Sequence, residues 1–312
     1  NSDQVLNIPA IPKHLAIIGG GVIGLEFASL FGMMGSQVTI VEAMDRLVSD
    51  FDRDCVKELI KCWRSHKIAI HTNTTLEDLS MTKNKVTLTI KTKDTGGQNG
   101  DDQQKVTCDA VLFAVGRLPE TSGLGLEHVA VATDDQGFIM VNEHLQTKSQ
   151  GIYAVGDVIS TPSLAHTATA EAHYVIDHMT KTPANPIDYL NNPLAIYTYP
   201  ELARVGYKEE ELQAMKTPYK VSRFPFSVMA KAMIEGYPEG FIKLLSHQET
   251  GEILGVHLIG GRVTEMVSEF TLGKVLETTI FEFAHTIRPH PTLSETLSEV
   301  AYQAMGEPLH AP

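Results

Sequence analysis

Three glycines and a later acid are the residues of this chain whose types and spacing best suit chemistry. Gly19, Gly21 and Gly24 form a G-x-G-x-x-G pattern directly after the apolar residues 15–18. The first glycine permits a tight turn, the second lets the backbone approach a pyrophosphate, and the third allows close helix–strand packing. Residues 22–34 carry a helical apolar stripe, so a helix N-terminus would offer unpaired N–H groups to phosphates. The predicted cofactor-binding residues here are Gly19, Gly20, Gly21, Val22, Ile23 and Gly24.

Glu42 is the acid that gives this pattern a cofactor preference. It follows a second predicted strand, 37–41, at about the 20-residue spacing that dinucleotide sites show. A carboxylate there accepts hydrogen bonds from the adenosine ribose and repels a 2′-phosphate, which favours NAD(H) over NADP(H). Arg46 opposes this preference, because a nearby arginine can favour the phosphate. The alternative is a plain glycine turn followed by a solvated glutamate.

His290 and Glu295 are a second candidate pair, near the end of the chain. On residue type alone, a histidine before a proline is more often a turn residue. Thr292-x-x-Glu295 also has the form of a capping box at the start of a helix. Gly116 ends the apolar strand predicted over 110–115, either facing the dinucleotide cleft or forming an ordinary turn.

The bulk composition limits the function classes. The chain has 312 residues, 43% hydrophobic and 20% charged, with a net charge of −13. Such a length predicts two or three domains. The acidic balance disfavours nucleic acid and would suit a basic partner surface. Apolar runs stay well short of the roughly 18 residues that a membrane span needs.

The cysteines point to packing and a reducing compartment, the cytoplasm or, in a eukaryote, the mitochondrial matrix. Cys55 and Cys62 fall on one face of a helix predicted over 54–65, about 10 Å apart. That separation is too long for a disulfide. Cys108 precedes an apolar strand, and the 13 histidines are scattered. We therefore expect no metal site.

The elements that must position these residues indicate an α/β fold. A strand, a helix and a second strand over 15–41 form a β–α–β unit with a parallel pair. We expect a Rossmann-like NAD-binding domain over 1–118, a central segment over 119–187 and a last domain over 188–312. The polar residues 95–102 should form a hairpin loop. Further strands are predicted over 68–71, 86–91, 105–108, 194–199, 219–224, 241–246 and 253–259, and helices over 165–180, 262–277 and 292–305.

Taken together, the motifs resemble the flavoprotein disulfide reductases, the class I pyridine nucleotide-disulfide oxidoreductases, and among them most closely the dihydrolipoamide dehydrogenases. The matching segments, in the family's order, are residues 18–26, 41–42, 114–117, 152–158, 164–166, 197–201 and 290–295. The resemblance implies FAD and NAD as cofactors and a homodimer joined through a C-terminal α+β dimerisation domain. It also implies that the central segment is a remnant of the FAD-binding domain.

The resemblance assigns a catalytic role to His290 and Glu295. The histidine would take the proton from a substrate dithiol, since the thiolate is the nucleophile that attacks a disulfide. The glutamate would orient the imidazole and stabilise its charged form. In the family this histidine serves the other subunit's site.

The resemblance also assigns cofactor contacts. Glu26 would pair with a lysine beside the flavin, although alone it reads as a surface helical glutamate. Leu76 would line the adenine pocket, and Asp157 would bind the ribityl chain of FAD, unless it only forms a Gly-Asp turn or caps a helix. The segment beside the isoalloxazine would be Ser163, Leu164, Ala165 and His166.

The departures from the family are as informative as the matches. The family has an N-terminal FAD domain with its own glycine fingerprint and a Cys-x4-Cys disulfide, and this sequence contains neither. The lysine partner of Glu26 is also missing, Thr167 stands where a basic residue is usual, and Arg288-Pro289 precede His290. We therefore expect a C-terminal portion of a longer enzyme. Alone, these residues should bind NAD weakly, hold little FAD and show no dithiol–NAD turnover.

The expected activity of the intact protein is oxidation of protein-bound dihydrolipoamide by NAD through FAD and a redox disulfide. Its expected partner is the acyltransferase core of a 2-oxo acid dehydrogenase complex. A glutathione reductase is one alternative, against which Glu42 argues because that class looks for NADPH. A mercuric reductase is another, against which the His290–Glu295 pair argues. A third alternative is a non-catalytic NAD-binding and dimerisation module.

Overall fold

A computed structural model describes residues 1–93 and 102–310. The predicted hairpin loop lies outside the described residues, apart from Asp102, which begins a strand. The chain divides into two compact units, one made of Asn1–Val115 and Pro193–Pro312 and the other of Gly116–Asn192. The first unit thus contains both ends of the sequence. The three-domain division stays a prediction.

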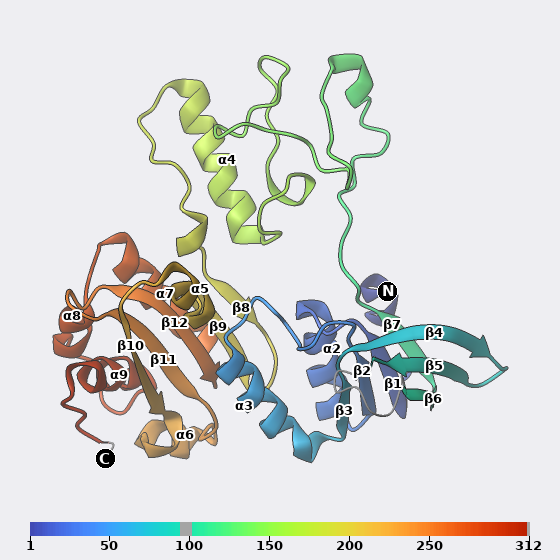
Figure 1. The fold of residues 1–312 in the computed structure, drawn as a ribbon, viewed down its shortest axis with the longest axis horizontal. Helices are drawn as coiled ribbons and strands as arrows, with labels where there is room; N and C mark the ends of the chain where they lie inside the picture. Colours follow the sequence, from blue (N-terminus) through green and yellow to red (C-terminus); the bar gives the residue numbers. More distant parts are fainter. Residues whose placement is uncertain (94–101, 311–312) are drawn as a thin grey trace. The chain divides into compact units, whose positions relative to one another are not determined.

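A four-stranded parallel sheet carries the glycine motif (Figure 1). Its order is β3 (Ile68–His71), β2 (Gln37–Val41), β1 (His14–Ile18) and β7 (Ala110–Phe113), and α2 (Val22–Met33) connects β1 to β2. Ile18 pairs with Val41, so Gly19 and Glu42 emerge at the same edge of the sheet. The predicted β–α–β unit is confirmed, and so is the mixed α/β class with a Rossmann-like parallel sheet.

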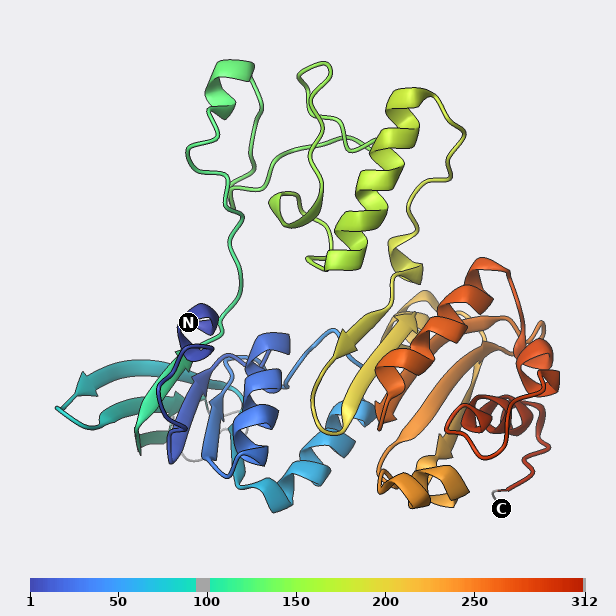
Figure 2. The same ribbon diagram turned by 180° about the vertical axis from the view of Figure 1, so that it is seen from behind.

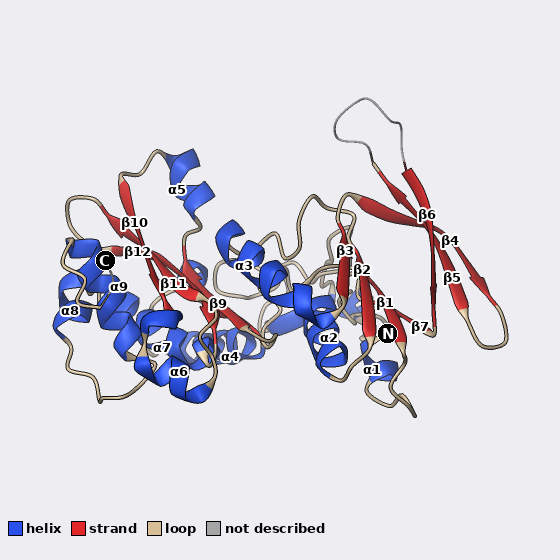
Figure 3. Cartoon of the chain, turned by 90° about the horizontal axis from the view of Figure 1, so that it is seen from below, coloured by secondary structure: helices blue, strands red, loops and turns tan. Residues whose placement is uncertain are grey.

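A three-stranded antiparallel meander adjoins this sheet (Figure 3). It consists of β4 (Thr74–Met81), β5 (Val86–Thr92) and β6 (Asp102–Cys108). Its apolar face packs with Ile18 and Val41 of the parallel sheet. The sequence predicted β5 and β6 but not β4, in which a bulge between Leu76 and Asp78 interrupts the alternation of inward and outward residues.

The C-terminal part is a five-stranded antiparallel sheet covered by helices (Figure 1). Its order is β10 (Tyr219–Pro225), β11 (Phe241–His247), β12 (Ile253–Gly260), β9 (Glu201–Gly206) and β8 (Leu194–Ile196). A large apolar core joins this sheet to α7 (Val263–Val275), α8 (Ile280–His285) and α9 (Glu295–Met305). The strand and helix predictions hold here, whereas β9, α8 and two short helices, α5 (Glu209–Met215) and α6 (Ala230–Glu235), were not predicted.

A second core unites the parallel sheet with the C-terminal sheet, and α3 (Arg53–Trp63) lies within it (Figure 2). Leu15 and Ile17 of β1 share this core with Phe241 and Ile259 of the C-terminal sheet. Trp63 is almost fully buried, and its indole N–H donates to the Tyr199 carbonyl at 2.9 Å. Burial of a large side chain contributes roughly 1.5–3 kcal/mol. This shared core is the reason why the two ends of the chain form one unit.

The second unit is built on α4 (Ala165–Thr180), which matches the predicted helix. Its small core includes Ile139, Ile159 and Tyr174, and a 3-10 turn, η3 (Gly156–Val158), precedes the helix. The remaining short helical elements of the two units are α1 (Ser2–Val5), η1 (Arg64–His66), η2 (Leu126–Val129), η4 (Tyr189–Asn191) and η5 (Phe226–Val228). Over the described ranges, every helix falls short of the length and apolar character needed to cross a membrane.

Candidate functional site

At two of the three motif glycines a side chain would clash with the protein backbone, and at the third it would meet open space. Gly19 has φ of +108°, and a Cβ there would lie 2.3 Å from the Ala114 carbonyl oxygen. A Cβ on Gly24 would lie 2.1 Å from the Gly19 carbonyl oxygen. By contrast, a Cβ on Gly21, the N-cap of α2, would have nothing within 4 Å. The loop therefore offers an open backbone position at a helix N-terminus, which fits a pyrophosphate.

Glu42 is held at this loop by backbone donors. The Gly20 N–H donates to one carboxylate oxygen at 2.5 Å, and the Met44 N–H donates to the other at 2.7 Å. Val22 and Ile23 form the first turn of α2 directly after the loop. The carboxylate is therefore fixed at the edge where β1 and β2 end, and it is not a freely solvated side chain.

Arg46 is already paired with a carboxylate from the C-terminal part of the chain. Its two terminal nitrogens donate to the two oxygens of Glu210 at 2.7 and 3.1 Å, and one of them also donates to the Ser49 carbonyl at 2.7 Å. Arg53 donates to the same carboxylate. The hydrogen bond from Arg46, with that from Arg53, lowers the pKa of Glu210 to about 2. Arg46, the residue that could have favoured a 2′-phosphate, is thus bound to Glu210.

Glu26 is a tether between α2 and the segment before β9. Its carboxylate accepts the Tyr197 N–H at 3.0 Å, and the hydroxyl of Ser29, one turn later, accepts the Tyr199 N–H at 2.8 Å. Glu26 is thus half-buried and hydrogen-bonded within the chain, and its role beside the flavin stays a prediction. Leu76 lies half-buried on β4, where it packs against the core beneath the meander.

Asp157 lies in the second unit, in η3, where Arg117 is its neighbour. The Arg117 Nε and an Asp157 carboxylate oxygen are 3.3 Å apart. The N–H of Gly156 donates to the fully buried Glu171 at 2.6 Å, and the Tyr189 hydroxyl donates to the other oxygen of Glu171 at 2.9 Å. Burial, with the neighbouring Glu171, raises the pKa of Tyr189. Glu171 thus fixes the turn that carries Asp157, a role that the sequence did not reveal.

The predicted flavin-side segment forms the entry to α4. Ser163 and Leu164 precede the helix, and Ala165 and His166 occupy its first turn, with His166 exposed. Thr167 is buried, and its hydroxyl accepts a hydrogen bond from the Asn192 side chain at 2.7 Å. This contact joins the first turn of α4 to Asn192. Gly116, with φ of +129°, follows β7 by three residues.

His290 and Glu295 meet as the sequence predicted. The Nδ1 of His290 is 2.9 Å from one oxygen of Glu295, and the Thr292 N–H donates to the other oxygen at 2.8 Å. Although burial raises the pKa of Glu295, these two hydrogen bonds bring it below its usual value. The His290 side chain is 74% exposed, so the imidazole is held at one nitrogen and open to solvent around it.

The expected capping box is only half formed. Helix α9 begins at Glu295, and Ser294 is its N-cap residue. The Thr292 hydroxyl donates to the Pro289 carbonyl at 2.8 Å. A complete box requires that hydroxyl to accept a backbone N–H of the helix instead. Arg288, which departs from the family pattern, is buried and pairs with Glu269.

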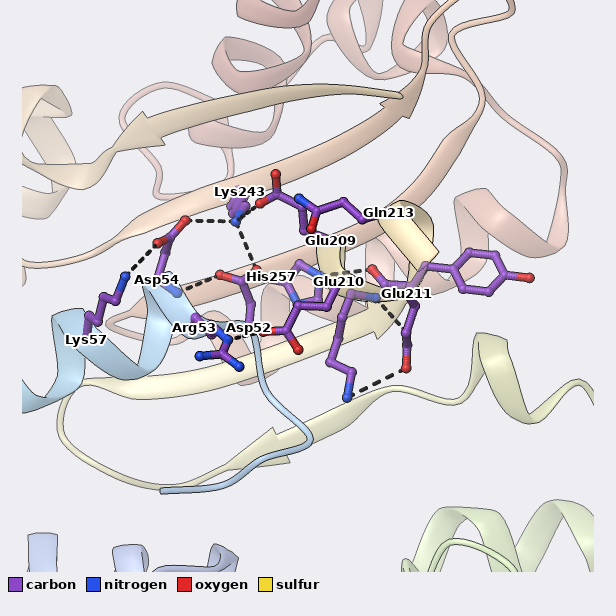
Figure 4. Close-up of polar contacts among 12 residues, drawn as sticks. Asp52, Arg53, Asp54, Lys57, Glu209, Glu210, Glu211, Gln213, Lys243 and His257 are labelled. Atoms are coloured by element: carbon purple, nitrogen blue, oxygen red, sulfur yellow. Dashed lines mark hydrogen bonds and ion pairs between the residues drawn. The ribbon is translucent and has the colours of Figure 1, made fainter. Parts of the chain in front are cut away.

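A buried ionic cluster joins α3, α5 and β11 (Figure 4). Lys243 is 2% exposed, and its Nζ donates to Asp52 at 2.9 Å, Asp54 at 2.8 Å and Glu209 at 2.6 Å. Burial lowers the pKa of Lys243, but the three carboxylates outweigh it and raise the pKa above its usual value. Sequence reasoning missed this cluster. The available signal was a single lysine within the apolar residues 241–245.

The three cysteines are free thiols. Cys55 and Cys62 both lie on α3, and Cys55 and Cys108 are buried. Burial raises the pKa of all three thiols, that of Cys62 to about 11, so they are protonated packing groups. Within residues 1–93 and 102–310, groups of three or more His, Cys, Asp or Glu side chains arranged to hold a metal ion are absent.

Comparison with known proteins gives two family matches. Residues 1–172 match the model described as pyridine nucleotide-disulphide oxidoreductase, and residues 192–301 match its dimerisation domain. The chain is 37% identical to dihydrolipoyl dehydrogenase of Bacillus subtilis over 99% of its own length and 64% of the relative. It is also 37% identical to the mitochondrial dihydrolipoyl dehydrogenase of Dictyostelium discoideum, over 99% of this chain and 63% of that one.

Two solved structures have a similar fold over most of this chain. The HOCl-induced flavoprotein disulfide reductase RclA of Escherichia coli, in its Cu(II) complex, superposes with a TM-score of 0.88 at 27% identity, over 96% of this chain and 66% of that one. LpdA of Mycobacterium tuberculosis gives a TM-score of 0.87 at 25% identity, over 96% and 63%. The chain thus spans less than two thirds of the length of these relatives.

Proposed function

The chain belongs to the pyridine nucleotide-disulphide oxidoreductase family, and from this premise we propose that it is the NAD-binding and dimer-forming portion of a dihydrolipoyl dehydrogenase. The intact enzyme would oxidise protein-bound dihydrolipoamide with NAD. The observation that carries this proposal is the pair of sites in one compact unit, the glycine loop with Glu42 and the His290–Glu295 pair.

The family uses FAD and NAD, and the residues present fit the nicotinamide cofactor. The open position at Gly21 and the N–H groups of α2 would hold the pyrophosphate, and Glu42 would accept the ribose hydroxyls. Leu76, on β4 of the same unit, would line the adenine pocket. The flavin when bound relays electrons from a dithiol to the nicotinamide.

Only part of a flavin site lies in this chain. Asp157, positioned by Arg117 and by the turn that Glu171 fixes, would contact the ribityl chain. Glu26 would face the flavin side of the nicotinamide pocket. The segment beside the isoalloxazine would be Ser163, Leu164, Ala165 and His166. We expect the pyrophosphate loop for FAD and the redox disulfide to come from sequence outside these residues.

His290 would accept the proton of the substrate thiol, which makes the attacking thiolate. When the Nδ1–H of His290 donates to Glu295, the other ring nitrogen would take that proton, and the carboxylate would stabilise the imidazolium that results. We propose that the dimerisation domain builds a homodimer in which this pair serves the partner subunit. The acidic chain would dock on a basic surface of an acyltransferase core, in a reducing compartment.

The alternatives make different predictions for the same two sites. An NADPH-linked glutathione reductase is disfavoured by Glu42 and by the engagement of Arg46 with Glu210. A mercuric reductase is disfavoured by the His290–Glu295 pair. A non-catalytic NAD-binding module would keep the first site but have no use for the second, so His290→Gln would leave every property of the intact protein unchanged.

The test has two parts. For these 312 residues, titration calorimetry should show weak NADH binding that is at least about 10-fold tighter than NADPH binding, and Glu42→Arg should reverse the order. The absorption spectrum should lack flavin bands, and dithiol–NAD turnover should be absent. A yellow, active sample of this chain, or equal affinity for the two cofactors, would contradict the proposal. In the intact enzyme, His290→Gln should reduce kcat by at least about 100-fold.

A further inference from the structure

We propose that Glu210 is a positioning residue for cofactor choice, because it holds the guanidinium of Arg46 away from the adenosine end of the dinucleotide site. This inference rests on the proposed NAD site at the glycine loop and Glu42. It assigns the preference against a 2′-phosphate to two features: Glu42, whose carboxylate repels the phosphate, and Glu210, whose carboxylate binds the guanidinium of Arg46.

Arg46 is carried by a segment that touches the glycine loop itself. The segment begins at Glu42, where β2 ends, and runs to α3. The Val48 N–H donates to the Gly20 carbonyl at 2.9 Å, and a Cβ on Gly20 would lie 2.5 Å from a methyl of Leu47. The backbone of Arg46 is therefore fixed beside the site. Only the direction of its long side chain decides where the positive charge lies.

That direction is set from the C-terminal part of the chain. Both terminal nitrogens of Arg46 donate to Glu210, and the side chain is only 16% exposed. A bidentate pair of this kind fixes a guanidinium more firmly than a single bond does. A third bond to the Ser49 carbonyl holds the same nitrogen that reaches the farther oxygen of Glu210.

The helix that carries Glu210 is held by the buried ionic cluster around Lys243 (Figure 4). Glu210 is the second residue of α5, and the preceding Glu209 accepts a hydrogen bond from the buried Lys243 at 2.6 Å. Lys243 in turn holds Asp52 and Asp54 at the start of α3. The same ionic cluster therefore fixes the start of α3, where the Arg46 segment ends, and also the helix that carries Glu210.

A released Arg46 would have the chemistry that the site now excludes. A guanidinium can bind two phosphate oxygens in the same bidentate manner in which it binds the two oxygens of a carboxylate. The 2′-phosphate is the group that distinguishes NADPH from NADH, so a free guanidinium beside Glu42 would favour NADPH selectively. Glu210→Gln removes the competing negative charge and one of the two acceptor oxygens without shortening the side chain.

The experiment is titration calorimetry of the 312-residue chain with NADH and with NADPH. Glu210→Gln should strengthen NADPH binding at least about 5-fold relative to NADH, and Glu210→Gln with Arg46→Gln should return the ratio to the starting value. Glu211→Gln is the matched control, since it makes the same charge change one residue along α5, where Glu211 bonds Lys208 and not Arg46. It should leave the ratio within about 2-fold.

The outcomes separate this inference from the proposed function. If the unaltered chain binds neither dinucleotide, the proposed NAD site fails. If it binds NADH and the ratio for Glu210→Gln equals that for Glu211→Gln, the role of Glu210 is refuted. Arg46→Gln alone gives an independent check that does not depend on how well Glu210→Gln folds. It should leave NADPH affinity unchanged, and a weaker affinity would overturn the inference by showing that Arg46 already reaches the phosphate.

Discussion

The imidazole of His257 is fully buried in the middle of the C-terminal sheet, and its Nε2 lies 3.0 Å from the Tyr207 carbonyl. Burial lowers its pKa to about 4, assisted by Arg204 and Lys243, while Asp52 and the carbonyl act in the opposite direction. The unfolded chain keeps a pKa of about 6.5. Below that pH the unfolded state therefore binds a proton that the folded state refuses.

We predict that His257 lowers the free energy of unfolding as the pH falls. The contribution of His257 is fully present above pH 6.5 and is lost between about 6.5 and about 4, by about 3 kcal/mol in all. Replacement by Gln should flatten the pH dependence of the free energy of unfolding in that window, measured by urea denaturation. Equal slopes for the two proteins would refute the prediction. His285→Gln, on the short helix α8, is the control and should keep the slope.

Lys243 is the residue whose loss should cost most stability. Replacement by Met would leave the carboxylates of Asp52, Asp54 and Glu209 facing one another without the cation that they share. Removal of one partner from a buried ionic group typically destabilises by about 3–5 kcal/mol. Denaturant titration near pH 7 should show a loss of this size. Lys220→Met, at an exposed position of β10, should change stability by less than about 0.5 kcal/mol.

At the scale of the element, one substitution in the glycine loop should lower stability and another should lower NADH affinity. Gly24→Ala places a Cβ 2.1 Å from the Gly19 carbonyl oxygen, so the backbone must shift, and we expect a loss of about 1–3 kcal/mol. Gly21→Ala places its Cβ in open space, so the melting temperature should stay nearly constant. The same Cβ would occupy the approach of the pyrophosphate, and NADH affinity should fall at least about 10-fold. An unchanged affinity in Gly21→Ala would place the cofactor elsewhere.

Local sequence patterns predicted the elements that position the site. They did not predict contacts between residues that lie far apart in the sequence. The β–α–β unit was predictable because an apolar strand, a glycine turn and a helix-length apolar segment follow one another within about 30 residues. The His290–Glu295 pair was implied by the family resemblance, and its two members lie only five positions apart. Short elements such as α5, with 7 residues, are too brief to show a period. The contact of Lys243 with Asp52 spans 191 positions, and no local pattern encodes it.

At the scale of the whole molecule, the dimerisation domain carries large apolar side chains on its surface. They include Leu272, Val275, Leu276, Phe281 and Ile287 on and after α7. On the proposed homodimer, we predict that sedimentation gives twice the 34.2 kDa chain mass. Ile287, which is 96% exposed, should lie within the interface, and Ile287→Asp should raise the dimer dissociation constant at least about 10-fold.

The control for this prediction lies outside the dimerisation domain. Met81 is 75% exposed at the end of β4, and Met81→Asp should leave the dissociation constant unchanged. A monomer at micromolar concentration, or equal behaviour of the two variants, would contradict the proposed interface.

The joining of the first and last segments into one compact unit also sets an order of events during synthesis. The parallel sheet and α3 leave the ribosome long before β11 and β12 do. Until then, the apolar side of α3 lacks its cover, and Asp52 and Asp54 repel one another without Lys243. The nascent Rossmann-like half must therefore wait, with an exposed face, for more than a hundred further residues to be translated. Its lifetime in that state makes it a natural client of chaperones, and slower translation after residue 115 should increase its aggregation.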